Sequence, residues 1–155
     1  MDALSTARED IKEMRVKLDK GAFMPERAHI LDAGFDIKTP VSITVPPFTA
    51  HNGPGKAIIH TGIHVEVPKG HGGMLKSKSG LNIKDDIIGE GVIDVGYTGE
   101  IVVKLYNLGT KEHHFEPGDK IIQLVFGVIS TPDMELVEEL AETERGSNGF
   151  GSTGA

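Results

Sequence analysis

The sequence predicts an all-β protein, a jelly-roll-like β-barrel subunit with a flexible C-terminal lid and a short N-terminal extension. Its 155 residues include 20 glycines and 8 prolines, spread along the chain as turns between many short strands would be. Apolar and polar residues alternate over Gly99–Asn107, so Ile101, Val103 and Leu105 are expected on one buried face. No long core helix is indicated, which disfavours a helical bundle.

The elements follow from local composition. Residues 1–13 are expected to be an extension, in which 3–12 form a short helix or a loose segment. Residues 14–140 are expected to form the barrel domain. Residues 132–140 start extended, with a helical turn as one option at their end, and 141–155 form the flexible lid arm. Strands are predicted at 15–19, 35–38, 42–45, 57–59, 63–67, 73–76, 92–94, 99–107 and 120–128, with a break at Gly89-Glu90-Gly91.

Composition excludes several classes of protein. The chain has no cysteine, which excludes disulfides, a cysteine-ligated zinc site and a thiol nucleophile. Its formal net charge of −7 is opposite to the footprint of a general nucleic-acid binder. The longest apolar run is far shorter than the ~18 residues that span a bilayer, and the first residues do not resemble a secretory leader. We therefore expect a cytoplasmic protein with neither a nucleic-acid nor a membrane partner.

Two carboxylates stand close to glycines in turn-forming sequence. Asp94 lies within Gly91-Val92-Ile93-Asp94-Val95-Gly96-Tyr97, where it either activates a water molecule or closes a β-turn. Asp36 ends the segment Asp32-Ala33-Gly34-Phe35-Asp36. This carboxylate either holds hydrated Mg²⁺, which prefers oxygen ligands and keeps its waters, or belongs to a turn and an exposed strand start.

Groups that suit phosphate occur in two places. Lys76-Ser77-Lys78-Ser79-Gly80 combines two cations with two hydroxyls, which fits either a phosphate contact or a solvated basic turn. Near the C-terminus, Arg145 can donate two hydrogen bonds to a phosphate, and Phe150 offers a flat apolar face to a base. Gly151-Ser152-Thr153 suits a phosphate cradle. The alternative for this glycine-rich segment is an ordinary mobile tail.

The seven histidines do not predict a metal site. His60 and His64 would stand ~13 Å apart in one strand at ~3.3 Å per residue. His113 and His114 would face opposite sides of an extended segment. The histidines are therefore expected to be structural or surface residues.

Five segments, taken in order, resemble the five motifs of the trimeric dUTP diphosphatase (dUTPase) family. The resemblance covers roughly residues 14–155. The matching segments are Asp32–Ile37, Lys78–Leu81, Gly91–Glu100, Pro117–Leu124 and Arg145–Gly154.

The resemblance implies a homotrimer of jelly-roll-like subunits with shared active sites. It implies Mg²⁺-assisted hydrolysis of dUTP to dUMP and pyrophosphate, which lowers dUTP and supplies dUMP for thymidylate synthesis. By position, Asp94 would activate the attacking water and Asp36 would hold Mg²⁺ through water. The hairpin backbone at Gly91 and Val92 would read the uracil edge, and Tyr97 would pack against the deoxyribose.

The resemblance also assigns the phosphate contacts. Lys78 stands where the family usually has arginine, which removes a bidentate contact. Attack on the α-phosphorus requires an in-line water, a base and charge neutralisation. Asp94 as the base, with Mg²⁺ and Arg145 as the cations, would supply these without a covalent intermediate. The residues implied to bind the substrate's phosphates are Lys78, Ser79, Gly80, Arg145, Gly151, Ser152 and Thr153, with Phe150 stacked over the base. Gln123 would contact phosphate or the water network.

Two other functions stay open. The related dCTP deaminases share the fold and the third motif, but the position of their catalytic glutamate is Lys104 here, which cannot act as a carboxylate. A non-catalytic trimeric module that docks a regulatory protein, with 1–13 as its handle, is disfavoured by the presence of Asp94, Gln123 and Arg145. A regulatory protein partner in addition to catalysis stays open.

Overall fold

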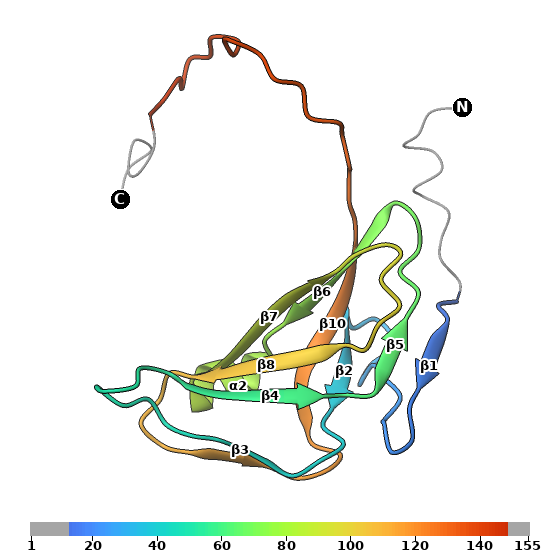
Figure 1. Cartoon of the computed structure of the whole chain (residues 1–155), viewed down its shortest axis with the longest axis vertical. Helices are drawn as coiled ribbons and strands as arrows, with labels where there is room; N and C mark the ends of the chain where they lie inside the picture. Colours follow the sequence, from blue (N-terminus) through green and yellow to red (C-terminus); the bar gives the residue numbers. More distant parts are fainter. Residues whose placement is uncertain (1–12, 149–155) are drawn as a thin grey trace.

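The chain folds into a curled antiparallel sheet flanked by two small sheets (Figure 1). The computed structural model describes residues 13–148. Its elements are β1 (Val16–Leu18), β2 (Gly34–Lys38), β3 (Ile43–Val45), β4 (Gly55–His60), β5 (Ile63–Val65), β6 (His71–Lys76), α2 (Ser79–Asp85), β7 (Ile87–Ile93), β8 (Val102–Asn107), β9 (His113–Phe115) and β10 (Lys120–Val128). The large sheet has the order β2-β10-β6-β7-β8-β4, and the small sheets are β1-β5 and β3-β9. This architecture confirms the prediction of an all-β, jelly-roll-like fold.

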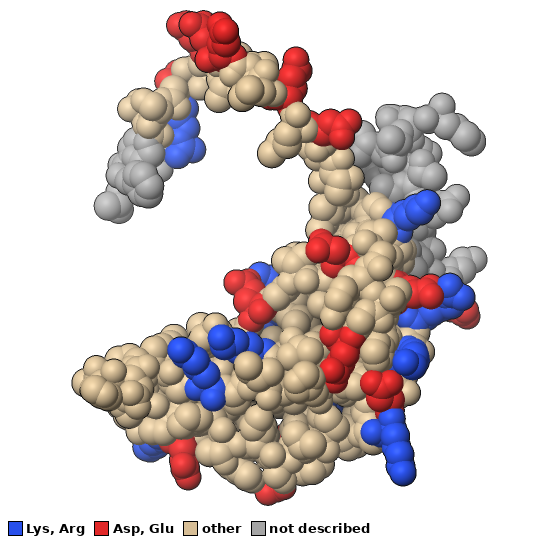
Figure 2. Space-filling view, in the orientation of Figure 1, with Lys and Arg blue, Asp and Glu red and all other residues tan. Residues whose placement is uncertain are grey.

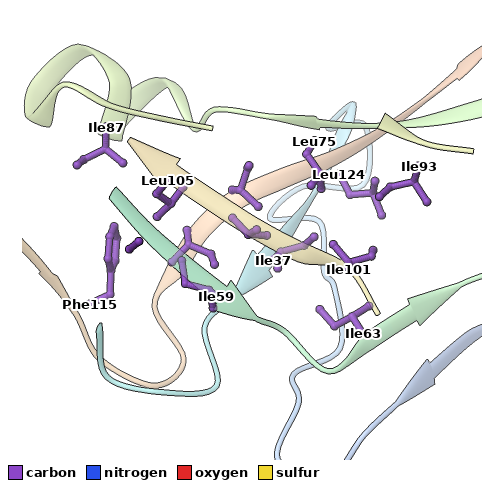
Figure 3. Close-up of a cluster of buried hydrophobic side chains, with 14 of the residues drawn as sticks. Ile37, Ile59, Ile63, Leu75, Ile87, Ile93, Ile101, Leu105, Phe115 and Leu124 are labelled. Carbon is purple, nitrogen blue, oxygen red and sulfur yellow. The ribbon is translucent and has the colours of Figure 1, made fainter. Parts of the chain in front are cut away.

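Alternation along the strands builds the core on the inner face of the sheet. In β8, Val103 and Leu105 are buried whereas Val102 and Lys104 are exposed, as the alternation over 99–107 predicts. Each fully buried aliphatic side chain contributes roughly 1.5–3 kcal/mol relative to exposure. Figure 3 shows the cluster, whose labelled members are Ile37, Ile59, Ile63, Leu75, Ile87, Ile93, Ile101, Leu105, Phe115 and Leu124.

The strand β7 runs through its glycines, so the predicted break at Gly89-Glu90-Gly91 is wrong. Gly89 is buried, and a Cβ there would lie 2.9 Å from Ile122 Cδ1 and 3.0 Å from Lys104 O. A glycine inside a strand allows close approach of a neighbouring backbone. Gly89 therefore serves packing between strands instead of ending one.

The short helix α2 follows β6 almost directly and is not predicted by the sequence pattern. Its apolar residues do not form a buried stripe, because Leu81 is only half-buried and Ile83 is 81% exposed. The helix ends at Asp86 in the left-handed conformation, with φ 55° and ψ 26°, and the Asp86 N–H donates to Leu81 O. Lys78 is the N-cap residue, so the second motif spans the entry to a helix.

A long arm leaves the body beyond β10. Residues 130–148 are exposed and form neither helix nor strand, so the helical turn considered for 132–140 is absent. The arm is acidic, as the red atoms along it show in Figure 2. Its acidic residues are Asp133, Glu135, Glu138, Glu139, Glu142 and Glu144.

Two predicted features lie outside the described residues. They are the short helix or loose segment over 3–12 and the ligand-binding residues Phe150, Gly151, Ser152 and Thr153. Over 13–148, no helix is long and apolar enough to cross a bilayer.

Candidate active site

A row of polar side chains crosses four adjacent strands on the outer face of the large sheet. The register pairs Asp36 of β2 with Gln123 of β10, Gln123 with Lys76 of β6, and Lys76 with Glu90 of β7. Residues directly opposite one another in antiparallel strands share a face. Because neighbouring strands lie ~4.8 Å apart, the row is roughly 14 Å long.

Asp36 is a buried carboxylate held by two lysines. It is only 6% exposed. Lys78 Nζ donates to Asp36 Oδ1, and Lys120 Nζ lies 2.7 Å from Oδ2. Burial acts to raise the pKa of Asp36, but the hydrogen bonds from Lys120 and Lys78 outweigh it and leave that pKa lowered. The hydrogen bond to Asp36 in turn raises the pKa of Lys120, so the carboxylate of Asp36 and the ammonium of Lys120 are both charged at neutral pH.

A β-bulge in β10 brings both Lys120 and Gln123 to Asp36. Residues three apart in a regular strand face opposite sides of a sheet. The register of β10 against β2 shifts between Lys120 and Ile122, and Ile121 and Ile122 are both buried. The extra residue returns Gln123 to the face that carries Lys120, as bulges near functional sites often do.

Gln123 links the first motif to the residue that precedes the second. Its Nε2 donates to Ser77 O at 3.1 Å. A Cβ at Gly34 would lie 2.4 Å from Gln123 Oε1, so the glycine of the first motif leaves room for this amide. Ser77 Oγ also donates to Gly89 O at 3.1 Å and accepts from Gly89 N at 3.0 Å. These contacts fix the backbone that leads into Lys78.

The row carries an excess of positive charge in an acidic chain. Lys76 pairs with Glu90 across β6 and β7, and the pair lowers the pKa of Glu90. Lys76, Lys78 and Lys120 thus face two carboxylates, which leaves one uncompensated cation. A local positive potential of this kind attracts an anionic ligand despite the overall net charge. A surface cleft beside the row is lined by Lys76, Ser77, Ile88, Gly89, Glu90 and Tyr106.

The third motif forms the turn that follows β7. Tyr97 N donates to Asp94 O at 3.2 Å, and Gly96 has a φ of +87°, which the third position of a type II turn requires. The Asp94 side chain is exposed and has no hydrogen-bond partner among residues 13–148. The Asp94 backbone therefore closes a turn, as one of its two interpretations predicts, while the carboxylate remains accessible.

Tyr97 is held in a defined position at this turn. Its hydroxyl donates to Glu100 O at 2.8 Å, and a Cβ at Gly99 would lie 2.6 Å from the ring. Tyr97 as a whole residue is 46% exposed, so it is accessible to a ligand. Gly91 is half-buried and Val92 is 67% exposed, which places both at the surface of the same hairpin.

One chain does not bring all the predicted site residues together. Asp94 lies four residues beyond Glu90, which is roughly 13 Å along the strand, and the row then extends roughly 14 Å across to Asp36. Lys78, Ser79, Gly80 and Gln123 lie at the Asp36 end, where Ser79 and Gly80 are exposed. Arg145 lies on the arm, where its Nε donates to Asn148 O at 3.0 Å.

The donor set decides how Mg²⁺ could be held. Among residues 13–148, no group of three or more His, Asp or Glu side chains could hold a metal ion. Both oxygens of Asp36 already accept from lysines, but a carboxylate has about four lone-pair sites. Mg²⁺ usually keeps several waters and is bound through one or two carboxylates plus substrate phosphates. The residues present therefore fit a hydrated ion, and Asp36 would be the group that accepts hydrogen bonds from its waters.

His60 and His64 each contact a different carboxylate. His60 Nδ1 lies 2.8 Å from Glu100 Oε2, and His64 Nε2 lies 3.0 Å from Asp19 Oδ2. These contacts agree with the structural role predicted for them. In β9, His113 is half-buried and His114 is exposed, which confirms that they face opposite sides.

Sequence reasoning assigned no role to Lys120 or Gly34, and it considered Ser77 only as a hydroxyl in a candidate phosphate segment, whereas that hydroxyl bonds to Gly89. Lys120 follows the turn at Pro117-Gly118-Asp119 in the fourth motif, but its direction depends on the bulge. No sequence signal marks that bulge. The roles of Gly34 and Ser77 depend on Gln123, a partner far along the chain, so local patterns cannot reveal them.

The fold and the site define a class: a jelly-roll-like β protein with a cation-rich, carboxylate-containing surface suited to a phosphorylated ligand. A family model described as dUTPase matches residues 20–154. The chain belongs to the dUTPase family, and this confirms both the family and the enzyme class, dUTP diphosphatase, predicted from the ordered motifs.

Similar proteins agree over most of the chain. The deoxyuridine 5'-triphosphate nucleotidohydrolase of Mus musculus is 41% identical over 140 residues, which is 90% of this chain and 83% of that protein. The Staphylococcus bacteriophage 80alpha dUTPase with dUpNHpp has a TM-score of 0.82 at 33% identity, covering 93% of this chain and 99% of the other. That phage protein is described as controlling transfer of virulence genes.

A third relative concerns the metal. A mutant dUTPase from phage phi11 of S. aureus has a TM-score of 0.73 at 29% identity, with 84% of this chain and 99% of that chain covered. It is described as revealing the coordination of a structural Mg(II) ion.

Proposed function

We propose that this chain hydrolyses dUTP to dUMP and pyrophosphate with Mg²⁺, and thereby lowers dUTP and supplies dUMP for thymidylate synthesis. The observation that carries the proposal is the outer-face row. At its Asp36 end, the carboxylate of the first motif and the amide of the fourth lie beside the cation of the second, in a chain that the dUTPase model matches.

Asp94 is the proposed general base. Its exposed carboxylate, on a backbone held by the turn to Tyr97, takes a proton from a water molecule. The water oxygen bonds to the α-phosphorus, and the bond from that phosphorus to the bridging oxygen of pyrophosphate breaks. Bound Mg²⁺ supplies charge neutralisation on the phosphate oxygens, and Asp36 is proposed to hold it through water.

The hairpin around Asp94 is proposed to select the nucleoside. Gly91 and Val92 present backbone groups at the hairpin surface, where hydrogen bonds can read the uracil edge. The Tyr97 ring, fixed by its bond to Glu100 O, packs against the deoxyribose and disfavours a 2′-hydroxyl. Specificity then follows from a rigid surface with little room for extra groups.

The second motif is proposed to bind the phosphates. Lys78 supplies charge, and the exposed Ser79 and Gly80 supply a hydroxyl and backbone N–H groups. A Cβ at Gly80 would meet nothing within 4 Å, so a ligand can approach the backbone there. Gln123 contacts phosphate or the water network in the prediction, and its bond to Ser77 O supports an additional part in holding this segment.

The active site is proposed to be shared in a homotrimer. The separation of Asp94 from Lys78 along and across the sheet supports this arrangement, because one nucleotide cannot contact both groups of a single chain. The arm is proposed to act as the lid: Arg145, Gly151, Ser152 and Thr153 close on the terminal phosphates and Phe150 stacks over the base. Closure of such a segment excludes bulk water during the reaction.

A substrate panel tests the proposed function. The purified chain is incubated with dUTP, dCTP, dTTP and UTP plus Mg²⁺, and pyrophosphate and ammonia are measured. We expect pyrophosphate from dUTP at a far higher rate than from the other three nucleotides. Ammonia release from dCTP would instead identify a deaminase, and inertness toward all four nucleotides would favour a non-catalytic module.

Asp94→Asn tests the base. Loss of a general base lowers kcat by about 10²–10⁴-fold, whereas the neutral amide preserves the shape of the hairpin. We expect turnover to fall by that factor and the affinity for dUpNHpp to stay within about threefold, measured by calorimetry. Asp133→Asn, on the exposed arm, is the matched control. Near-normal turnover in Asp94→Asn would remove Asp94 from this role.

A further inference from the structure

We propose that Lys120 is a positioning residue of the phosphate site, which neutralises Asp36 and so leaves the charge of Lys78 available to substrate phosphates. The inference rests on the proposed function, because it concerns the same nucleotide site. It assigns a role to a residue that the predicted contacts leave without one.

Charge balance is the first argument. Asp36 forms ion pairs with Lys78 and Lys120. The exposed fraction of the side chain is 9% for Asp36, 26% for Lys78 and 43% for Lys120. With both lysines present the cluster carries one net positive charge. Without Lys120, Lys78 and Asp36 would form a neutral pair with little attraction for an anion. The additional lysine therefore decides whether Lys78 acts as a cation toward phosphate.

Geometry is the second argument. Lys78 and Lys120 contact different oxygens of Asp36, so the carboxylate cannot rotate without breaking a charge-assisted hydrogen bond. This two-point hold also keeps the Lys78 ammonium in one place. A cation that is already oriented loses less conformational entropy when a ligand binds.

The contact of Lys120 with Asp36 is specific, because the lysine opposite it on strand β2 contacts a different carboxylate. Lys38 is paired with Lys120 in the register of β2 and β10 and shares its face. Lys38 nevertheless contacts Glu26 Oε2 at 2.9 Å instead of Asp36. Proximity alone therefore does not bring a lysine to Asp36, and Lys38 provides a matched control for substitution.

The test measures ligand affinity without catalysis or metal. Full-length Lys120→Met, Lys120→Arg and Lys38→Met are titrated calorimetrically with dUpNHpp and with dUMP in EDTA. For Lys120→Met we expect dUpNHpp to bind about tenfold more weakly and dUMP to bind as in the wild type, because the lost charge acts on the outer phosphates. Lys120→Arg should stay within about threefold of the wild type, and Lys38→Met should leave both affinities unchanged.

A second substitution distinguishes neutralisation of Asp36 by Lys120 from direct contact between Lys120 and phosphate. Asp36→Asn added to Lys120→Met removes the carboxylate that captures Lys78, so we expect dUpNHpp affinity to return to within about threefold of the wild type. A double variant as weak as Lys120→Met would show that Lys120 touches phosphate itself and would overturn the proposal. Equal weakening of dUMP and dUpNHpp would indicate a structural defect and would also overturn it.

The outcomes are distinguishable from failure of the proposed function. A wild-type chain that turns over dUTP, together with a Lys120→Met variant that binds dUpNHpp normally, would refute only the role of Lys120. A wild-type chain inert toward the whole substrate panel would refute the proposed function itself.

Discussion

At the scale of single residues, the site depends on space as much as on charge. Gly34 has no catalytic group, yet a Cβ on it would overlap the amide of Gln123. That amide holds Ser77 O, which precedes Lys78. A glycine in one motif therefore determines the position of a cation in another, through a contact between strands β2 and β10.

Gly34→Ala should lower stability. The added methyl group would displace Gln123 and break its hydrogen bond to Ser77, and overpacking of this kind costs about 1–3 kcal/mol. Urea unfolding followed by circular dichroism measures the change. Gly80→Ala is the matched control, because nothing lies within 4 Å of a Cβ there and alanine favours a helix. Equal stability of the two variants would refute the packing argument.

At the scale of elements, a histidine of β5 anchors the loop that carries Tyr97. His64 Nδ1 lies 2.9 Å from Thr98 O and Nε2 lies 3.0 Å from Asp19 Oδ2. Both partners are acceptors, so only the doubly protonated ring donates to both. The hydrogen bond to Asp19, followed by that to Thr98, raises the pKa of His64, while Lys17 opposes the change.

This anchor predicts a pH-dependent stability. A raised His64 pKa gives stabilisation that is full below the ordinary value of 6.5 and is lost as the pH rises through the folded pKa. The pKa of Asp19 is lowered from 3.8, so its contribution is full above that value and is lost in acid. The excess stability of the wild type over His64→Gln should therefore be largest between these two values.

Urea midpoints measured across the pH range check this prediction. His60→Gln is the matched control, because His60 lies on strand β4 with Glu100 as its partner. This variant should show the same pH dependence of stability as the wild type. A constant difference between the wild type and His64→Gln at every pH would show that the ring does not titrate as described.

At the scale of the whole molecule, the arm and the body are physically separable. The arm leaves the core after β10, and its residues 130–148 are exposed (Figure 1). Within the described part of the arm, residues 145–148 therefore cover no core surface. The same segment carries Arg145 and is proposed to complete the site on binding.

Deletion of residues 145–155 should spare folding and cripple catalysis. We expect an unchanged thermal midpoint and an assembly mass three times that of the truncated chain, with turnover reduced by at least about 10²-fold. Light scattering and a pyrophosphate assay measure these quantities. Removal of Ala155 alone is the control. A truncated chain as fast as the full one would refute the lid.

Mixing two inactive variants tests the proposed sharing of sites between the chains of a homotrimer. Asp94→Asn and the 145–155 deletion are each expected to be inactive. After the two are refolded together, sites that combine Asp94 from one chain with the arm of another should regain a measurable part of wild-type turnover. A site contained within one chain would give no recovery, because every chain in the mixture carries one defect.

Several features were accessible from the sequence because they depend on local order. Alternation over 99–107 predicted the buried face of β8, and five motifs in sequence predicted the family. The predicted break at Gly89-Glu90-Gly91 was wrong and α2 was not predicted, because the local sequence pattern is ambiguous at both places. A glycine has the same local signature whether it turns the chain or packs against Lys104 O and Ile122, and a seven-residue helix with little buried surface has no periodic pattern.

The sequence by itself determined the β architecture, the family and the chemical groups available for a nucleotide. Alternation of apolar and polar residues and the order of motifs can both be recognised from residues close together in the chain. Only the tertiary structure decided which groups meet. The bulge that directs Lys120 to Asp36, the contact of Gly34 with Gln123, and the separation of Asp94 from Lys78 all depend on strand register. Register is set by packing between segments far apart in the chain.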